Sequence, residues 1–181
     1  MTASPSTERP GRYERSFRGL AGALLVILLV LAVFVGFRGL TRGDQSSPVP
    51  AVNYHPELRY AQRQATFRLL APARLPAGWK ATSVNFRPGR DQHWHLGMLT
   101  AAQHYVGVEQ GDVSVAQMTD AYLRGHPRAG RPVNVAGSTW STYSTASGDL
   151  GVVRRAGRTT DLVVGHDVPR RTLLAFLASL R

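Results

Sequence analysis

Two histidines one residue apart are the side chains best suited to chemistry in this sequence. His93 and His95 lie in a segment where apolar and polar residues alternate. Side chains two positions apart on a β-strand share one face of the sheet, so two imidazoles there can bind one cation. His104 or Glu109, from the next predicted strand, would supply a third ligand. A two-histidine pattern without a defined third ligand is a weak metal signal, so we favour half-exposed histidines on the outer face of a sheet and assign no metal.

Other catalytic patterns are missing from the sequence or incomplete. Glu109 and Asp112 flank Gly111, and paired carboxylates can perform acid–base chemistry or bind calcium. Two carboxylates fall well short of a calcium loop, so we interpret them as solvated turn residues. The sequence contains no Gly-x-Ser-x-Gly, phosphate-binding loop, dinucleotide fingerprint or His-Glu-x-x-His motif. With no cysteine, thiolate catalysis, disulfides and cysteine-bound metals are excluded as well. We therefore predict no catalytic residue and no cofactor, and a non-enzyme is the better interpretation.

The three tryptophans form a candidate binding surface. Trp79, Trp94 and Trp140 could line a groove, although buried tryptophans more often anchor a core. Trp94 alternates in phase with Leu96 and Met98, which favours the core. Trp79 follows a predicted turn and is the tryptophan we expect to be most exposed.

Hydrophobic periodicity predicts the elements that must position these side chains. Helical patterns cover residues 54–65, a segment beginning with the capping box Ser114-Val115-Ala116-Gln117, and residues 169–180, where Asp167 is the expected cap. Alternating patterns predict three strands before the middle helix and four after it, with turns at Gly137, Gly148 and Gly157. The predicted fold class is α+β, an antiparallel sheet of about seven strands covered by helices.

The N-terminal part has the pattern of a membrane anchor. Residues 19–37 contain no charge, and as a helix they would extend about 28 Å, close to the ~30 Å hydrocarbon core. Four arginines precede this stretch and two follow closely, which predicts a cytoplasmic N-terminus. We expect a cytoplasmic tail over 1–18, a transmembrane helix over 19–37, a linker over 38–53 and an extracytoplasmic domain over 54–181. A cleaved signal peptide and a buried helix are the alternatives.

The charge balance bears on partners. The chain has a formal net charge of +11, and from Ala51 onward sixteen Lys and Arg stand against eight Asp and Glu. A basic surface of this kind suits an anionic cell-wall polymer or lipid headgroups, and an envelope protein is a further candidate. The arginines are scattered and not interleaved with aromatic residues, so we expect no nucleic-acid partner.

Several short segments, taken in order, resemble a known family. They are Tyr54-His55-Pro56-Glu57, Leu75-Pro76-Ala77-Gly78-Trp79, Trp94-His95-Leu96-Gly97, Tyr105-Val106-Gly107-Val108-Glu109-Gln110, Val135-Ala136-Gly137 followed by Trp140, and the C-terminal Ala178-Ser179-Leu180. Their order resembles domain-of-unknown-function family 4245, membrane-anchored proteins of high-GC Gram-positive bacteria. The resemblance implies a single-pass layout and carries no activity. The order of elements also resembles the PsbP-like αβα sandwich, an analogy of fold only.

The functional expectation is an extracytoplasmic binding or interaction module held at the cell membrane, without a defined enzymatic activity. One alternative is a metal-dependent envelope hydrolase that uses His93 and His95. Another is a sensor or an accessory subunit of a membrane complex, although a tail of about eighteen residues is too short to fold as an output domain.

Overall fold

The computed structural model describes residues 49–181 and, before them, Leu24, Ile27, Val30 and Leu31, which are helical. The chain divides into two units, Met1–Pro48 and Val49–Arg181. Among the described residues, no helix is long and apolar enough to span a membrane. Apart from those four positions, the predicted transmembrane helix over 19–37 lies outside the described residues, as does most of the linker.

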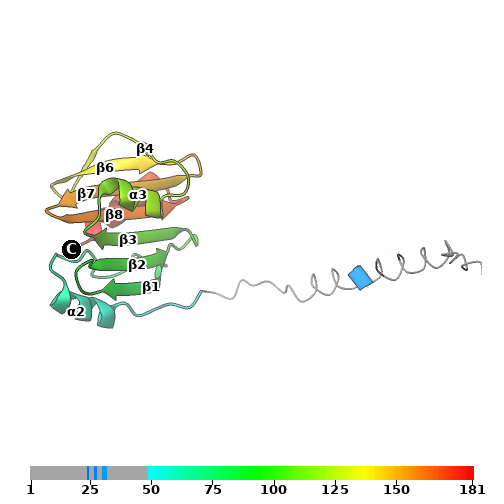
Figure 1. Cartoon of the computed structure of the whole chain (residues 1–181), viewed down its shortest axis with the longest axis horizontal. Coiled ribbons are helices and arrows are strands. Elements are labelled where there is room, and N and C mark those ends of the chain that lie inside the picture. The colour runs from blue at the N-terminus through cyan, green and yellow to red at the C-terminus, as the bar shows by residue number, and fades with distance from the viewer. Residues whose placement is uncertain (1–23, 25–26, 28–29, 32–48) are drawn as a thin grey trace, which may run out of the picture. The chain divides into compact units, whose positions relative to one another are not determined.

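The unit Val49–Arg181 is built around one antiparallel sheet. Its strand order is β1-β2-β3-β8-β7-β6-β4, and β5 pairs separately with β6 (Figure 1). The strands are β1 Lys80–Arg87, β2 His93–Leu99, β3 Tyr105–Gly111, β4 Arg128–Ala129, β5 Val133–Val135, β6 Ser138–Ser144, β7 Asp149–Ala156 and β8 Thr159–His166. All of these pairings are antiparallel, so the α+β prediction is confirmed.

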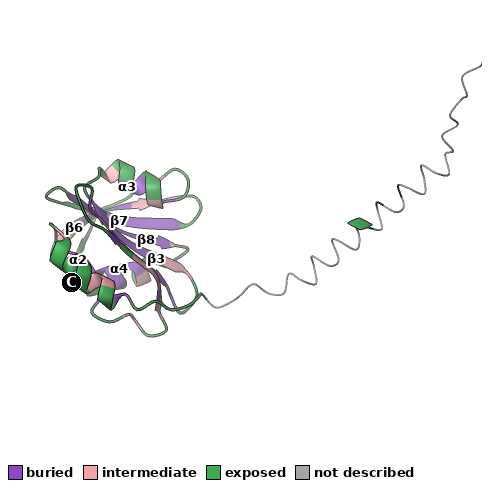
Figure 2. Ribbon diagram, turned by 60° about the horizontal axis from the view of Figure 1, so that its bottom comes forward, coloured by how far each residue is buried: buried purple, intermediate pink, exposed green. Residues whose placement is uncertain are grey.

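The larger core lies between one face of the sheet and two helices, α2 (His55–Gln64) and α4 (Arg170–Ser179). Figure 2 shows both helices on the side of the sheet opposite α3. The β2 residues predicted to face the core are completely buried there, together with β3, β7 and β8 residues of the same phase; they include Trp94, Leu96, Met98, Val106, Val108, Val152 and Val163. Burial of their apolar area is the main force holding these helices to the sheet.

The opposite face carries the short helix α3 (Val115–Tyr122) over β7 and β8. Met118 and Leu123 pack there with Val153, Leu162 and Val164 in a smaller core. The predicted capping box is confirmed: Ser114 Oγ accepts from the Gln117 amide at 3.2 Å, and Gln117 Oε1 accepts from the Ser114 amide at 3.0 Å. α3 lies over β7 and β8. On the same face of the sheet, β1 and β2 carry polar side chains that are half-buried.

One sequence prediction needs correction. Asp167 does not cap α4: the cap position is Pro169, which has no side-chain cap bond, while Asp167 has a φ of 56° in the turn before it. The prediction of about seven strands agrees with the sheet, to which the structure adds the two-residue β4, where Arg128 and Ala129 pair with Ser144 and Tyr143. A two-residue strand has no periodicity from which it could be predicted.

Candidate functional site

The side chains of Ser83, His95 and Glu109 form a hydrogen-bonded line across β1, β2 and β3. Ser83 Oγ lies 2.8 Å from His95 Nε2, and His95 Nδ1 lies 2.6 Å from Glu109 Oε1. Register explains the line, because His95 is directly opposite Glu109, and Ser83 is opposite Gly97, two residues from His95. Opposed residues of antiparallel strands place their side chains on one face. We call these three residues the Ser83 relay.

Local backbone features give the Ser83 hydroxyl its position. A bulge at Thr82 lets Ala81 enter the core while Ser83 remains on the opposite face. A Cβ at Gly97 would overlap Ser83 Oγ and lie 3.2 Å from His95 Nε2. The hydroxyl therefore occupies space that only a glycine leaves open.

His93 and Tyr122 extend the relay toward α3. The hydroxyl of Tyr122 lies 3.0 Å from His93 Nε2, and the two rings are stacked with centroids 6.1 Å apart. His93 Nε2 is also 3.4 Å from Glu109 Oε2, an oxygen with no hydrogen-bond partner. A cavity of about 250 Å³ adjoins this end, with Arg87, His93 and Tyr122 in its wall.

Burial controls the protonation of this cluster. The Glu109 side chain is fully buried, and this burial raises the pKa of Glu109, an effect that the hydrogen bond from His95 partly offsets. Burial, and then the charges of Arg87 and His95, lower the pKa of His93. Burial next to Glu109 raises the pKa of Tyr122 to about 12, so its hydroxyl keeps its proton at neutral pH.

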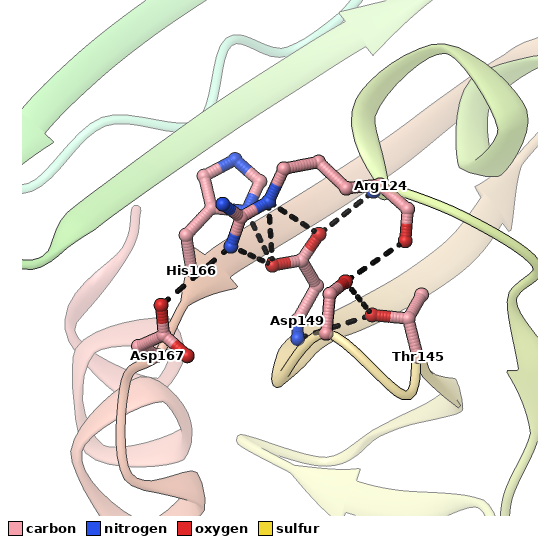
Figure 3. A network of polar contacts seen from close by, with 6 residues as sticks. Arg124, Thr145, Asp149, His166 and Asp167 are labelled. Carbon is pink, nitrogen blue, oxygen red and sulfur yellow. Dashed lines mark hydrogen bonds and ion pairs between the residues drawn. The ribbon is translucent and has the colours of Figure 1, made fainter.

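A second polar network ties the end of α3 to the β7 and β8 ends (Figure 3). The Asp149 carboxylate accepts hydrogen bonds from the Arg124 amide at 2.7 Å and from Arg124 Nε at 3.1 Å. His166 Nδ1 lies 2.8 Å from Asp149 Oδ1. Burial alone would raise the pKa of Asp149, but these contacts to Arg124 and His166 lower it to about 2. The network anchors the segment after α3.

An arginine-lined cavity opens near the β7–β8 turn. Its volume is about 500 Å³, and we call it the arginine pocket; it is lined by Thr66, Phe67, Arg68, Arg90, Gln92, Asp112, Arg154, Ala156, Gly157, Arg158, Thr159 and Asp161. Arg154 pairs with Asp161 at 2.9 Å, and Arg158 with Asp112 at 2.7 Å. Within residues 49–181, no carboxylate pairs with Arg68 or Arg90. Four arginines against two aspartates leave the lining positively charged.

Buried polar side chains fix the position of the pocket wall. Gln110, 1% exposed, accepts from the Leu70 amide at 2.6 Å and donates to the Arg68 carbonyl at 3.0 Å and to Asp161 Oδ1 at 2.7 Å. Gln92 accepts from the Thr66 amide at 2.8 Å in the same way. These bonds hold the segment that carries Arg68 against the sheet, so the pocket is preorganised.

The predicted metal candidates are only partly brought together. His93 and His95 meet Glu109, but His104 lies in the turn before β3, where its amide donates to Thr100 Oγ1. Four strand residues, about 13 Å, separate His95 from the Leu99 end of the ladder next to that turn. No group of three His, Asp or Glu side chains in the described part of the chain has an arrangement that could hold a metal ion.

Glu109 and Asp112, considered above as paired carboxylates, lie in different environments. Asp112 binds Arg158 at the rim of the arginine pocket, whereas Glu109 is completely buried in β3. The interpretation of Glu109 as a solvated turn residue is wrong, because β3 pairs with β2 and β8 as far as Gly111 and encloses it.

The tryptophans occupy three different environments. Trp94 is fully buried and donates from its indole nitrogen to the Leu70 carbonyl at 3.1 Å. Trp79 is half-buried and stacks on Phe176, with centroids 5.1 Å apart. Trp140 is 3% exposed, and the Arg154 guanidinium lies 4.5 Å above its ring. Trp140 also borders a cavity of about 250 Å³ that shares Arg68 and Arg154 with the arginine pocket.

Three sets of residues were not anticipated from the sequence: Ser83 with Tyr122, the Asp149 network, and the arginines of the pocket. Ser83 alternates in phase with Asn85, so its face was predictable, but its partner depends on the β1–β2 register. The pocket arginines come from three separate segments, with Arg154 and Arg158 on the β7–β8 hairpin, and no local pattern joins the three.

The fold and these sites define an α+β domain with an antiparallel sheet, a half-buried histidine–carboxylate cluster on one face and an arginine-lined cavity at one end of its strands. The chain belongs to the family described as "Protein of unknown function (DUF4245)", whose model matches residues 12–180. The resemblance inferred from the sequence segments is thereby confirmed. Neither the curated proteins nor the solved structures include a significant match to the chain.

Proposed function

We propose that this protein is a membrane-anchored, extracytoplasmic module that binds phosphate-bearing anions in the arginine pocket. The observation that carries the proposal is the pair Arg68 and Arg90, which line a cavity of about 500 Å³ without a carboxylate partner in residues 49–181. A cavity of this volume matches a small ligand or a polymer unit.

The chemistry of the lining supports a phosphate group as ligand. A guanidinium presents a planar fork of N–H donors that matches phosphate oxygens two at a time. Arg154 and Arg158 already neutralise Asp161 and Asp112, so an entering anion meets Arg68 and Arg90 as uncompensated charges. The buried Gln110 bonds fix the backbone of Arg68, which lowers the ordering cost of binding.

The proposed location rests on the sequence. An uncharged stretch over residues 19–37, with more arginines before it than after it, supports a single-pass helix and an outward-facing domain. Helices on both faces of the sheet support an αβα sandwich of the PsbP-like kind. Outside the membrane, both phospholipid headgroups and anionic wall polymers present phosphate diesters.

N-terminal sequencing of the protein extracted from membranes tests the anchor. We expect the intact N-terminus, whereas a mature chain beginning near Ala51 would replace the anchor with a cleaved signal peptide.

Calorimetric titration of the full-length chain in a neutral detergent tests the binding. The probes are a soluble glycerol-phosphate oligomer and, separately, phosphatidylglycerol in mixed micelles of the same detergent, so a polymer ligand and a lipid ligand give different results. We expect the Kd to be at least tenfold higher in the double variant Arg68→Ala/Arg90→Ala than in the wild type. Added salt should weaken the binding of the wild type. Arg170→Ala/Arg171→Ala, which removes two exposed arginines from α4, is the matched control and should leave the Kd unchanged.

Two results would contradict this function. One is no heat with either probe at millimolar concentration. The other is equal affinity of Arg68→Ala/Arg90→Ala and the Arg170→Ala/Arg171→Ala control, because binding would then depend on overall charge and not on the pocket.

A further inference from the structure

The Ser83 relay has the connectivity of a nucleophile, a base and an orienting acid. A serine hydroxyl becomes a nucleophile when an imidazole accepts its proton and a carboxylate holds that imidazole in the correct tautomer. Both bonds are formed here, at 2.8 Å and 2.6 Å. Since a buried carboxylate accepts from Nδ1–H, Nε2 carries the lone pair that faces Ser83.

The relay is also accessible. Ser83 is half-buried, and the His95 side chain is 23% exposed, whereas Glu109 is fully buried beneath them. This difference in exposure suits the roles of nucleophile, base and orienting acid, because the first two must meet a substrate and the third must not. β1 is the first strand in the sheet order (Figure 1), and the segment before α2 contacts it at Ala81, whose carbonyl accepts from the Val52 amide at 2.8 Å.

The relay is crowded on the side over Gly97. Ser83 Oγ, His95 Nε2 and the Tyr105 ring each lie within 3.2 Å of where a Cβ at position 97 would stand, so a substrate has no room there and must approach from the exposed side of Ser83 and His95, which suits a small acyl group. Asn85 is exposed on the same face, directly opposite His95. Its side-chain amide is a neutral donor for a developing oxyanion.

We propose that Ser83 and His95 hydrolyse carboxylic esters of small acyl groups, with Glu109 as the positioning residue. Ser83 Oγ attacks the ester carbonyl carbon while its proton passes to His95 Nε2. The tetrahedral intermediate collapses, the C–O bond to the alcohol breaks, and the alcohol leaves with that proton. Water, deprotonated by His95, then attacks the acyl-Ser83 carbonyl and releases the carboxylic acid and the free serine. Ester and water are the only reactants.

This activity does not depend on the arginine pocket, whose arginines are separate from the relay residues. Failure of the anion titration would leave the hydrolase proposal standing, and the reverse is also true.

Covalent labelling gives the most direct test. The full-length chain in neutral detergent is treated with an alkyl fluorophosphonate, which forms a serine O–P bond with loss of fluoride. We expect peptide mass spectrometry to find the adduct on Ser83 in the wild-type chain and none in Ser83→Ala. Ser141→Ala removes an exposed serine from β6 of the same sheet and should not change the labelling.

Hydrolysis of 4-nitrophenyl acetate gives the second readout. We expect at least a hundredfold lower kcat/KM in Ser83→Ala and in His95→Gln. Glu109→Gln should lower kcat and displace the pH–rate profile, whereas a purely structural role would lower the folded fraction without moving that profile. Circular dichroism checks that each variant is folded.

An unlabelled wild-type chain would overturn the proposal. So would a folded Ser83→Ala variant that hydrolyses the ester at the wild-type rate, because the serine would then take no part.

Discussion

The carboxylate of Asp149 offers the sharpest test of the electrostatics, through the substitution Asp149→Asn. The side chain is completely buried and binds the Arg124 amide, the Arg124 guanidinium and His166 Nδ1. Its pKa of about 2, against an ordinary 3.8, corresponds to about 2 kcal/mol of stability at neutral pH. Because the Arg124 side chain is 56% exposed, we take about half of that value.

Loss of the second acceptor oxygen adds to the cost. One of the donors that now faces the buried carboxylate is left without an acceptor, which costs about 1–2 kcal/mol. The total is about 2–3 kcal/mol, or about 7–11 °C in Tm for a unit of this size. Urea and thermal unfolding of the full-length chain, followed by circular dichroism, measure both quantities.

The dependence on pH gives a second, independent signature. A carboxyl whose folded pKa is lowered contributes stability that is complete above its unfolded pKa near 3.8 and is lost as the pH falls toward 2. The difference between wild type and Asp149→Asn should therefore shrink below about pH 3.

The matched control is Asp167→Asn. Asp167 is 60% exposed, lies 3.6 Å from Arg124 and has a positive φ that asparagine also tolerates. We expect a change below about 0.5 kcal/mol. Equal losses in the two variants would refute the assignment of the stabilisation to the buried carboxylate.

Four further perturbations follow from the geometry. Ala136→Gly should raise stability by about 0.5–1 kcal/mol in urea unfolding, because alanine has a φ of 52° there; no gain would contradict that strain. Gln110→Ala should cost about 2–3 kcal/mol by the same measurement, since it removes the partner of three groups, two of them in buried hydrogen bonds, and a loss under 1 kcal/mol would argue against those bonds. Gly97→Ala should cost about 1–3 kcal/mol and displace the Ser83 hydroxyl, seen as lost fluorophosphonate labelling in a folded variant. Glu109 has a raised folded pKa, so its contribution to stability is complete below pH 4.5 and declines as the pH rises through that pKa; Glu109→Gln should flatten the decline in urea titrations from pH 4 to 7, and an unchanged slope would refute it.

Local sequence patterns predicted much of the fold. Alternation in residues 94–98 separated Trp94 and Met98 from the histidines, and the structure has the same division. The capping box at Ser114 and Gln117 marked the start of α3, because the two reciprocal bonds involve only neighbouring residues. Elements defined by short-range spacing are therefore predictable.

The sites depend on contacts that spacing does not encode. Glu109 meets His95 only because the β2–β3 ladder has the register that pairs them, and one step of slip would turn one side chain to the other face. Gln110 joins Asp161 across 51 positions of the chain. Burial of Glu109 could not be foreseen either, since a carboxylate beside a glycine and an aspartate has the composition of an exposed turn.

The strand order has a consequence for how the domain folds. β1, β2 and β3 pair as successive hairpins, and so do β6, β7 and β8, but β3 pairs with β8 between Val106 and Gly165. Closing the loop between Val106 and Gly165 costs about 3–4 kcal/mol of chain entropy before any contact offsets it. Joining β1–β3 to β6–β8 should therefore be the slow step.

The two candidate sites then form at different times. Ser83, His95 and Glu109 all belong to the first three strands, so their register is set by local hairpins. The arginine pocket takes Arg68 and Arg90 from the first half of the chain and Arg154 and Arg158 from the second. In refolding from urea, the ability to bind an anion should appear only when the halves join, which would make it a reporter of the last event in folding.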